Sequence, residues 1–418
     1  MTTTAIVNAR VFDGECVLPQ TTVVIDGARI TAVGGAVPEG ADIVDAGGGT
    51  LLPGLVDAHV HTSAPALAVA LRFGVTTELE MQGTHTRDNR AHIAGDDTVA
   101  DVRSSGFGIT PPGGHPDELF PEGFRPGPPP GADGAGPSAA PPVKPLCTTP
   151  EEAAEAVPRL VEAGSDYIKF MIDDGTVEGH PGLPVLDRPT LEAGVAAAHR
   201  HGMLTVAHAL TLDATRMAIE AGIDGLTHVF MDRPHTEEII ELIAESGVFV
   251  IPCVVLNASM MGITGAGLAD DPRVNSRLDQ EWLTTLRSSF GHYRQGELDD
   301  VLASVGALHE AGVDILAGSD ASYPLAFLGG VAHGASVHHE LQYLVRAGMA
   351  PLEALRAATG IPARCFALED RGRIAEGLRA DLLLVDGDPT TTISDTLNIR
   401  TVWRRGTRAV EGRPAHSG

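Results

Sequence analysis

The sequence is poor in cysteine, aromatic residues and basic residues. Its 418 residues include 4% aromatic residues, and 29 Lys and Arg against 55 Asp and Glu. The formal net charge of −26 argues against nucleic acid or an anionic membrane as a partner, because both attract positive protein surfaces. The four cysteines, Cys16, Cys147, Cys253 and Cys365, are far apart and form no Cys-X-X-Cys pair. They predict buried thiols in a reducing compartment rather than disulfides.

Long apolar runs and targeting segments are also missing. No apolar run reaches the roughly 20 residues that a membrane-spanning helix needs. The first residues, from Met1 to Ala5, lack the basic segment and apolar core that are typical of a signal peptide. No glycine-rich dinucleotide fingerprint follows the early strands. With 43% apolar residues, the chain is predicted to be a globular, cytoplasmic protein that is long enough to bury a large core.

Strands and helices alternate through the middle of the chain. The expected strands cover residues 55–59, 75–80, 106–110, 166–172, 203–208, 225–228, 248–256 and 314–317. Most of them precede stretches rich in Ala, Glu and Leu; Thr149 is the expected N-cap of one such helix, with Pro150 at its first position. Eight successive strand–helix units favour an α/β fold, a (β/α)₈ TIM barrel over residues 56–369, rather than an open doubly wound sheet.

Short runs of β-branched residues at both ends of the chain predict a second, smaller domain. Asp26-Gly27 is a strong hairpin signal between two such runs. Residues 381–385 and 399–403 are similar runs near the other end. Neither end is long enough to close a core alone. We therefore expect residues 1–55 and 370–418 to build one composite β-sandwich domain beside the barrel.

Residues 111–145 interrupt the alternation with a segment rich in Pro and Gly. A loop of this length at the C-terminal end of a barrel strand predicts a lid or a wall of a substrate site. A disordered insertion without a role is the alternative.

The run of residues 51–61 ends in a His-X-His pair. Residues two apart on a strand point to the same side, so His59 and His61 can present two imidazoles to Zn²⁺ or a similar metal. Taken alone, such a pair is more often an ordinary surface or core feature. Its interpretation depends on distant residues that complete a site.

Four such residues lie at or near the ends of other expected strands. Lys169 lies within an apolar strand, where a charged amine is costly. It is either part of a structural ion pair or a neutral amine that can add CO₂ to form a carbamate. His208 and His228 each end an expected strand, and Asp320 follows one. Considered one at a time, the two histidines are more often core residues, and the aspartate is more often a helix cap. Together with the His-X-His pair, all of them fall on the face where barrel enzymes place their catalysts.

The chain resembles the amidohydrolase superfamily over essentially its whole length. The resemblance rests on residues 53–61, Lys169, His208, His228, residues 318–320 and the return segment 377–386. It is greatest to the branch of imidazolonepropionase-like proteins, Xaa-Pro-type dipeptidases and ochratoxin-hydrolysing amidases. Imidazolonepropionase itself is a poorer match, because the lysine points to a binuclear site. Asp173-Asp174-Gly175 is more acidic than expected of the peptidases, which leaves the substrate open.

The resemblance implies a centre of two divalent ions, with zinc the expected metal. His59, His61 and Asp320 would bind the more buried ion, and His208 and His228 the more exposed one. Lys169, carrying a CO₂-derived carbamate, would bridge them together with a hydroxide.

The resemblance also implies catalytic roles for three residues. Asp320 would carry the proton from the hydroxide to the leaving amine. His115 and Tyr167 would hold the substrate's carbonyl oxygen or carboxylate. An ordinary loop histidine and a core tyrosine are the alternatives for these two.

The function that follows is hydrolysis of the C–N amide bond of a small molecule or dipeptide by a metal-bridging hydroxide. A cyclic amide hydrolase or a heterocycle deaminase on the same metal centre is the main alternative, and a non-catalytic scaffold is a remote one. The expected partner is a small-molecule amide substrate, without nucleic acid or membrane, and the protein is expected to be a homo-oligomer.

Overall fold

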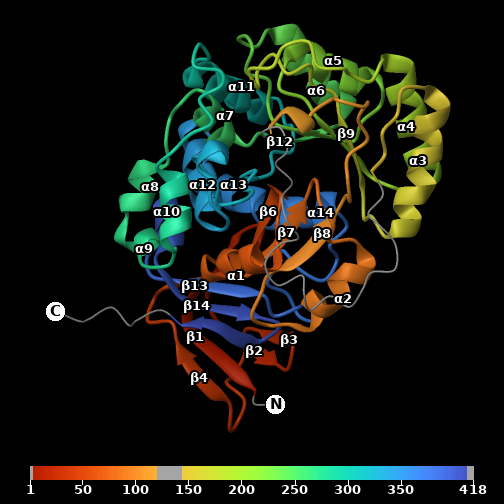
Figure 1. Cartoon of the computed structure of the whole chain (residues 1–418). Helices are drawn as coiled ribbons and strands as arrows, with labels where there is room; N and C mark the ends of the chain where they lie inside the picture. The colour runs from red at the N-terminus through yellow and green to blue at the C-terminus, as the bar shows by residue number, and fades with distance from the viewer. Residues whose placement is uncertain (1–2, 120–143, 412–418) are drawn as a thin grey trace.

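The computed structural model describes residues 3–119 and 144–411. Figure 1 shows a larger part of helices and parallel strands above a smaller part made of strands. The parallel strands form two sheets: β6 (Leu55–Val60), β7 (Val75–Glu80) and β8 (Asp101–Ser104) in one, and β9 (Ile168–Met171), β10 (Thr205–His208), β11 (Gly225–Thr227) and β12 (Phe249–Ile251) in the other.

Isolated parallel bridges connect the edges of these two sheets. Ile109 pairs with Phe170 of β9, Val250 of β12 with Ile315, and Val60 of β6 with Ala321. Residues 315–321 thus lie between the last strand of one sheet and the first strand of the other. The arrangement is TIM-barrel-like, as the alternation of strands and helices predicted.

Helices follow most of the parallel strands. The longer ones are α1 (Ala64–Arg72), α2 (Arg87–Gly95), α3 (Pro150–Ala163), α4 (Arg188–Arg200), α5 (Leu212–Glu220), α6 (Glu237–Ser246), α11 (Leu298–Glu310) and α12 (Ala335–Arg346). The shorter ones are α7 (Val254–Met260), α8 (Ala266–Asp270), α9 (Pro272–Asn275), α10 (Gln280–Leu286), α13 (Pro351–Ala357) and α14 (Gly360–Cys365). No helix in the two described ranges is long and apolar enough to cross a membrane.

The predicted start of α3 is confirmed. The Thr149 hydroxyl accepts a hydrogen bond from the Glu152 backbone N–H at 3.2 Å, and Pro150 occupies the first turn. The side chain thereby satisfies one of the N–H groups that a helix start leaves without an intrahelical partner. This local signal was sufficient because both groups lie within four residues of chain.

Three of the predicted strands were wrong in extent. Residues 106–110 contain only isolated bridges, since Gly106 turns the backbone to a φ of 68° and the strand of this unit, β8, ends at Ser104. The predicted strand 248–256 ends at Ile251, because Pro252 has no N–H and Cys253 takes a φ of 51° before α7. Residues 314–317 make a single bridge through Ile315.

The two ends of the chain meet in one eight-stranded sheet, ordered β15-β14-β13-β5-β1-β2-β3 with β4 beside β1. Its strands are β1 (Thr4–Phe12), β2 (Val17–Asp26), β3 (Arg29–Val33), β4 (Asp42–Asp45), β5 (Thr50–Pro53), β13 (Leu382–Val385), β14 (Ile399–Arg404) and β15 (Thr407–Glu411). The hairpin predicted at Asp26-Gly27 is present, where β2 pairs with β3. Strand β5 pairs with β13, although the two strands lie near opposite ends of the sequence. The predicted boundaries of this domain, residues 1–55 and 370–418, remain predictions, and so does a second sheet that would complete a β-sandwich.

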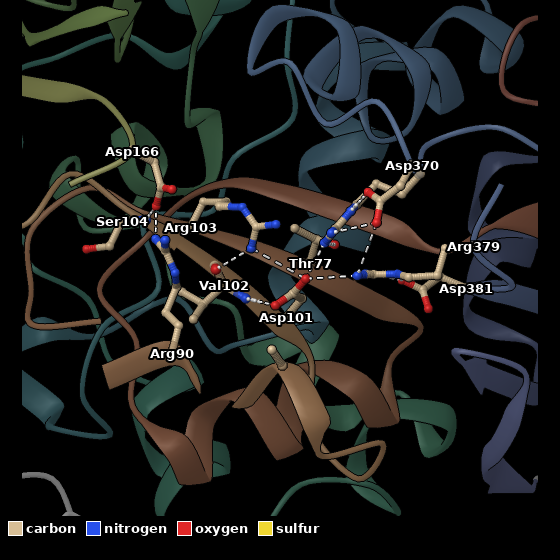
Figure 2. Close-up of polar contacts among 12 residues, drawn as sticks. Thr77, Arg90, Asp101, Val102, Arg103, Ser104, Asp166, Asp370, Arg379 and Asp381 are labelled. Carbon is tan, nitrogen blue, oxygen red and sulfur yellow. Dashed lines mark hydrogen bonds and ion pairs between the residues drawn. The ribbon is translucent and has the colours of Figure 1, made fainter. Parts of the chain in front are cut away.

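A buried network of ion pairs joins this terminal sheet to the parallel strands (Figure 2). Asp101, at the start of β8, binds Arg371 and accepts a hydrogen bond from Arg379 at 3.0 Å. Arg371 also donates to the Thr77 hydroxyl of β7 at 3.1 Å. Burial raises the pKa of Asp101, but Arg371, Arg103 and Arg379 outweigh it and hold that pKa well below its ordinary value. The carboxylate therefore stays charged and ties β8 to the segment that leads into β13.

Replacing Asp101 by Asn should reduce the free energy of unfolding by about 3 kcal/mol, because the buried Arg371 would keep only Asp370 of its two carboxylate partners. The matched control is Asp299→Asn, at an exposed pair with Arg346, which should change stability by less than about 0.5 kcal/mol. Denaturant unfolding measures both variants.

The same substitution should alter the acid response. The pKa of Asp101 is depressed in the folded protein, so its contribution is fully present above the ordinary value of 3.8 and is lost as the pH falls below that value. Asp101→Asn should therefore lose less stability than the parent below about pH 4. Equal stability losses for Asp101→Asn and Asp299→Asn would contradict this role of the network.

Candidate metal centre

The structure brings the predicted metal-binding residues to one end of the parallel strands. His59 lies in β6, Lys169 in β9 and His208 at the end of β10. His228 directly follows β11, and Asp320 lies next to the bridge that joins Ala321 to β6. Because the carboxyl ends of parallel strands meet at one edge, residues far apart in the sequence converge there.

His59, His61 and Asp320 form the tightest group. The Nε2 atoms of His59 and His61 lie 3.2 and 2.8 Å from Oδ1 of Asp320. One ligand atom from each of these three residues lies within 4.8 Å of the others, which is close enough to share one metal ion. The predicted set for the more buried ion is therefore assembled in space.

His208 and His228 lie beside this group. Their ring centroids are 4.6 Å apart, and those of His59 and His228 are 4.8 Å apart. The Nε2 atom of His228 is 3.8 Å from Oδ2 of Asp320, so Asp320 faces imidazoles of both predicted ion sites.

Lys169 is fully buried and donates a hydrogen bond to the Thr227 hydroxyl. Burial lowers the pKa of Lys169 to about 7, although the nearby Asp320 and Cys253 act in the opposite direction. The amine is therefore easily neutral near physiological pH, which is the form that adds CO₂. When it is protonated, the amine lowers the pKa of His59 and of His228, because it lies close to both rings.

The imidazoles are held in the form that binds metals. Burial lowers the pKa of His228 to about 3 and holds the pKa values of His59 and His208 well below their ordinary range. Neither ring nitrogen of His228 has a hydrogen-bond partner among the described residues, although both are buried. Neutral, unpartnered nitrogens inside a protein are costly unless a ligand satisfies them. The donor set thus fits divalent metal ions that accept imidazole and carboxylate ligands.

The backbone around these residues is unusual. His228, Cys253 and Asp320 have φ values of 72°, 51° and 53°, a region that residues other than glycine rarely adopt. Such conformations cluster at functional sites, where the surrounding structure holds them. Gly318 allows the close approach of Asp320 to β6, since an added Cβ would lie 2.9 Å from that of His59.

His115 joins the site together with two carboxylates that the sequence analysis did not single out. Its Nδ1 atom lies 2.6 Å from Glu118 and 3.8 Å from Glu178, and its ring stacks on His208 with centroids 4.2 Å apart. Burial lowers the pKa of His115, but the hydrogen bond that its Nδ1 donates to Glu118 and the charge of Glu178 raise it to about 9. These carboxylates therefore favour the protonated form of His115, beside the predicted metal ligands.

Cys253 and Glu178 also contact the predicted ligands. The Cys253 sulfur lies 3.5 Å from Nδ1 of His59, and Oε1 of Glu178 lies 3.1 Å from Nε2 of His208. The only sequence signal near Glu178 was the acidic run from Asp173 to Gly175, which lies in the same loop between β9 and α4. Nothing in the local sequence distinguishes Cys253 from a buried structural thiol.

The structure does not bring Tyr167 into this group. Its hydroxyl proton is shared between the backbone oxygens of Glu80 and Arg103, at 2.9 and 3.1 Å from the hydroxyl oxygen. Its ring packs on Phe366, and the residue lines a separate cavity with Arg103 and Asp370. Tyr167 precedes β9, whereas the ligands lie within or after their strands. The packing role that was the alternative for Tyr167 agrees with these contacts.

The predicted loop of residues 111–145 is described only at its two ends, because residues 120–143 lie outside the described residues. His115 and Glu118 belong to its first part, so this part of the loop reaches the site.

Comparison with known proteins agrees with this fold. A solved Xaa-Pro dipeptidase superimposes with a TM-score of 0.73 over 98% of this chain and all of its own, at 23% identity. An allantoinase of Solibacter usitatus is 26% identical over 92% of this chain and 84% of its own length. An adenine deaminase of Lysinibacillus sphaericus is 34% identical over 76 residues, which is 18% of this chain and only 12% of the deaminase.

Together the TIM-barrel-like fold and the clustered imidazoles define a metal-dependent hydrolase. More particularly, the chain belongs to the amidohydrolase family, whose sequence profile matches residues 50–409. It is accordingly an enzyme that hydrolyses carbon–nitrogen bonds.

Tyr167→Phe tests the separation of Tyr167 from the site. Removing the hydroxyl should reduce the free energy of unfolding by about 1 kcal/mol through the lost hydrogen bonds, and leave kcat and KM unchanged. His115→Asn is the contrasting variant and should lower kcat. Denaturant unfolding and steady-state kinetics on the same preparations measure both effects. A large fall of kcat in Tyr167→Phe would restore the catalytic role predicted for this residue.

Proposed function

We propose that the protein hydrolyses the linear amide bond of a small molecule or dipeptide at a centre of two divalent ions. The observation that supports this most directly is the convergence of two pairs of imidazoles, one carboxylate and one readily neutral lysine at the same strand ends. The overall similarity to a Xaa-Pro dipeptidase supports a linear amide.

His59, His61 and Asp320 would hold one ion, and His208 and His228 the other, with Lys169 as a carbamate between them. Zinc suits a set of imidazole and carboxylate ligands. When bound, such ions lower the pKa of water and polarise the amide carbonyl.

The remaining chemistry belongs to residues of the chain. Asp320 faces both predicted ion sites, so its carboxylate is placed to accept the proton of the attacking water and to deliver it to the leaving nitrogen. The His115 imidazolium supplies a positive charge for the carbonyl oxygen or for a carboxylate of the substrate.

A cyclic amide is the second candidate substrate. The match to an allantoinase over most of both chains supports it, and the same residues would perform the same proton transfers. Deamination of a heterocycle is supported by the short match to an adenine deaminase only. A screen of linear amides, cyclic amides and aminated heterocycles with zinc-loaded protein distinguishes these substrates by which class gives turnover.

The surrounding architecture is part of the proposal. We infer that the two parallel sheets close into one eight-stranded barrel, supported by the bridges Ile109–Phe170, Val250–Ile315 and Val60–Ala321. The sheet that both chain ends share supports a composite β-sandwich domain. The proposal also includes a cytoplasmic homo-oligomer that acts on a small-molecule amide.

Purified protein should contain about two divalent ions per chain, as a binuclear site requires. Lys169→Ala should lose activity and at least one ion, because the bridging group is removed. A short carboxylic acid added to this variant should partly restore turnover. Elemental analysis together with assays measures these effects. Full activity after chelation, in protein shown to be free of metal, would contradict the proposed centre.

Asp320→Asn separates proton transfer from ion binding. An amide oxygen still ligates weakly but carries no proton, so kcat should fall by about 10²–10⁴-fold even in preparations that retain both ions. Metal content and the pH dependence of kcat/KM are measured on the same preparation, and the acidic limb of the profile should shift or vanish. A fully metallated variant within about tenfold of the parent rate would show that another group carries the proton.

A further inference from the structure

The contacts of His59, His61 and His208 show which ring nitrogen of each faces the centre. His59 and His61 direct Nε2 toward Asp320, at 3.2 and 2.8 Å. Their Nδ1 atoms point away from it, His61 toward the backbone oxygen of Gln82 at 3.2 Å and His59 toward the Cys253 sulfur at 3.5 Å. Each ring therefore has one nitrogen for an ion and one for a partner on the outside.

His208 is oriented the other way round. Its Nε2 atom contacts Oε1 of Glu178 at 3.1 Å, with Oδ2 of Asp173 further away at 3.9 Å. This leaves Nδ1 as the nitrogen available to an ion. A hydrogen bond donated by Nε2 fixes the tautomer in which Nδ1 carries the lone pair.

The outside partners differ in strength. Glu178 is a buried carboxylate, whereas the partners of His61 and His59 are a neutral carbonyl and a thiol. Burial and the neighbouring Asp173 raise the pKa of Glu178 to about 8, but a carboxyl oxygen accepts a hydrogen bond from Nε2 in either protonation state. A carboxylate on the far nitrogen also makes the imidazole a stronger ligand. His208 thus depends on its partner more than the other two rings do on theirs.

We propose that Glu178 is a positioning residue that holds His208 in its ion-binding orientation and tautomer. The ion bound by His208 and His228 requires Glu178, and the ion bound by His59, His61 and Asp320 does not. This inference rests on the proposed two-ion centre. It assigns a role to Glu178, which no part of the sequence analysis singled out.

Another arrangement uses the same side chains differently. One ligand atom each of His115, Glu178 and His208 lies within 4.8 Å of the others, so the three can also enclose an ion directly. In that case His115 would be a ligand, and its removal would release the ion. If Glu178 instead positions His208 without binding the ion, His115 is not a ligand, and His115→Asn should leave both ion affinities unchanged. The two arrangements therefore make opposite predictions for one variant.

The experiment compares full-length Glu178→Gln, Glu178→Asp, Glu118→Gln and His115→Asn with the parent. Metal-free protein is titrated with Zn²⁺ against a chromogenic chelator, which resolves the affinity of each of the two sites. Glu178→Gln should weaken one site by about 10–100-fold and leave the other unchanged. Glu178→Asp, which keeps a carboxylate, should recover part of the loss.

Glu118→Gln is the matched control. It removes a buried carboxylate from the same cluster that contacts His115 but not His208, so both affinities should remain at the parent values. Titration with Co²⁺ adds a spectroscopic signature: the visible bands of the ion at the His208 site should change in Glu178→Gln, whereas those of the other ion should not. Circular dichroism of the metal-free variants checks that each is folded.

Three outcomes would overturn the inference. Glu178→Gln with both parent affinities would show that His208 needs no carboxylate. An equal loss in Glu118→Gln would assign the effect to the total charge of the cluster. Loss of the ion in His115→Asn would make these residues direct ligands. Failure of the proposed function is a separate result, because it appears in the parent protein as fewer than two ions or as no hydrolysis.

Discussion

The centre depends on the buried carboxylate of Asp57. Its Oδ1 accepts hydrogen bonds from the backbone N–H groups of Ser319 and His59, at 2.9 and 3.2 Å, and its Oδ2 accepts one from the Ser319 hydroxyl at 2.5 Å. The Asp320 N–H then donates to the backbone oxygen of His59 at 2.8 Å. A single side chain in β6 thus sets the position of a segment 262 residues away, and with it the distance between His59 and Asp320.

Other buried carboxylates act in a comparable way. Glu78 holds His333 at 2.7 Å, and Glu340 accepts the N–H groups of Val254 and Val255, at 3.0 and 2.9 Å, where α7 begins after Cys253. Burial raises the pKa of Asp57 to about 7, together with the charge of Glu78, and burial raises that of Glu340 to about 8. Such groups persist because each is hydrogen-bonded to backbone or to an imidazole near the strand ends. The proposed metal ligands are consequently surrounded by hydrogen-bonded polar groups.

The sequence could single out most of the proposed metal ligands because they lie within or directly after strands that can be recognised locally. The His-X-His pair, His208 and His228 each end an apolar run, and parallel strands place such residues at one edge. The errors have equally physical causes. Tyr167 shares its strand region with Lys169, yet its hydroxyl is used by two backbone oxygens. The strand expected at 106–110 was wrong because Gly106 turns the chain after β8.

The sequence by itself determined the residue types of the centre, the order of strands and helices, and the family to which the chain belongs. These follow from periodicity, helix caps and a specific set of side chains, all of which are local or recognisable in combination. Only the tertiary structure decided which nitrogen of each imidazole faces the centre, and that Glu178, Cys253 and Asp57 contact the ligands. Such contacts depend on how distant strands are aligned, and a shift of one residue would turn every side chain to the opposite face.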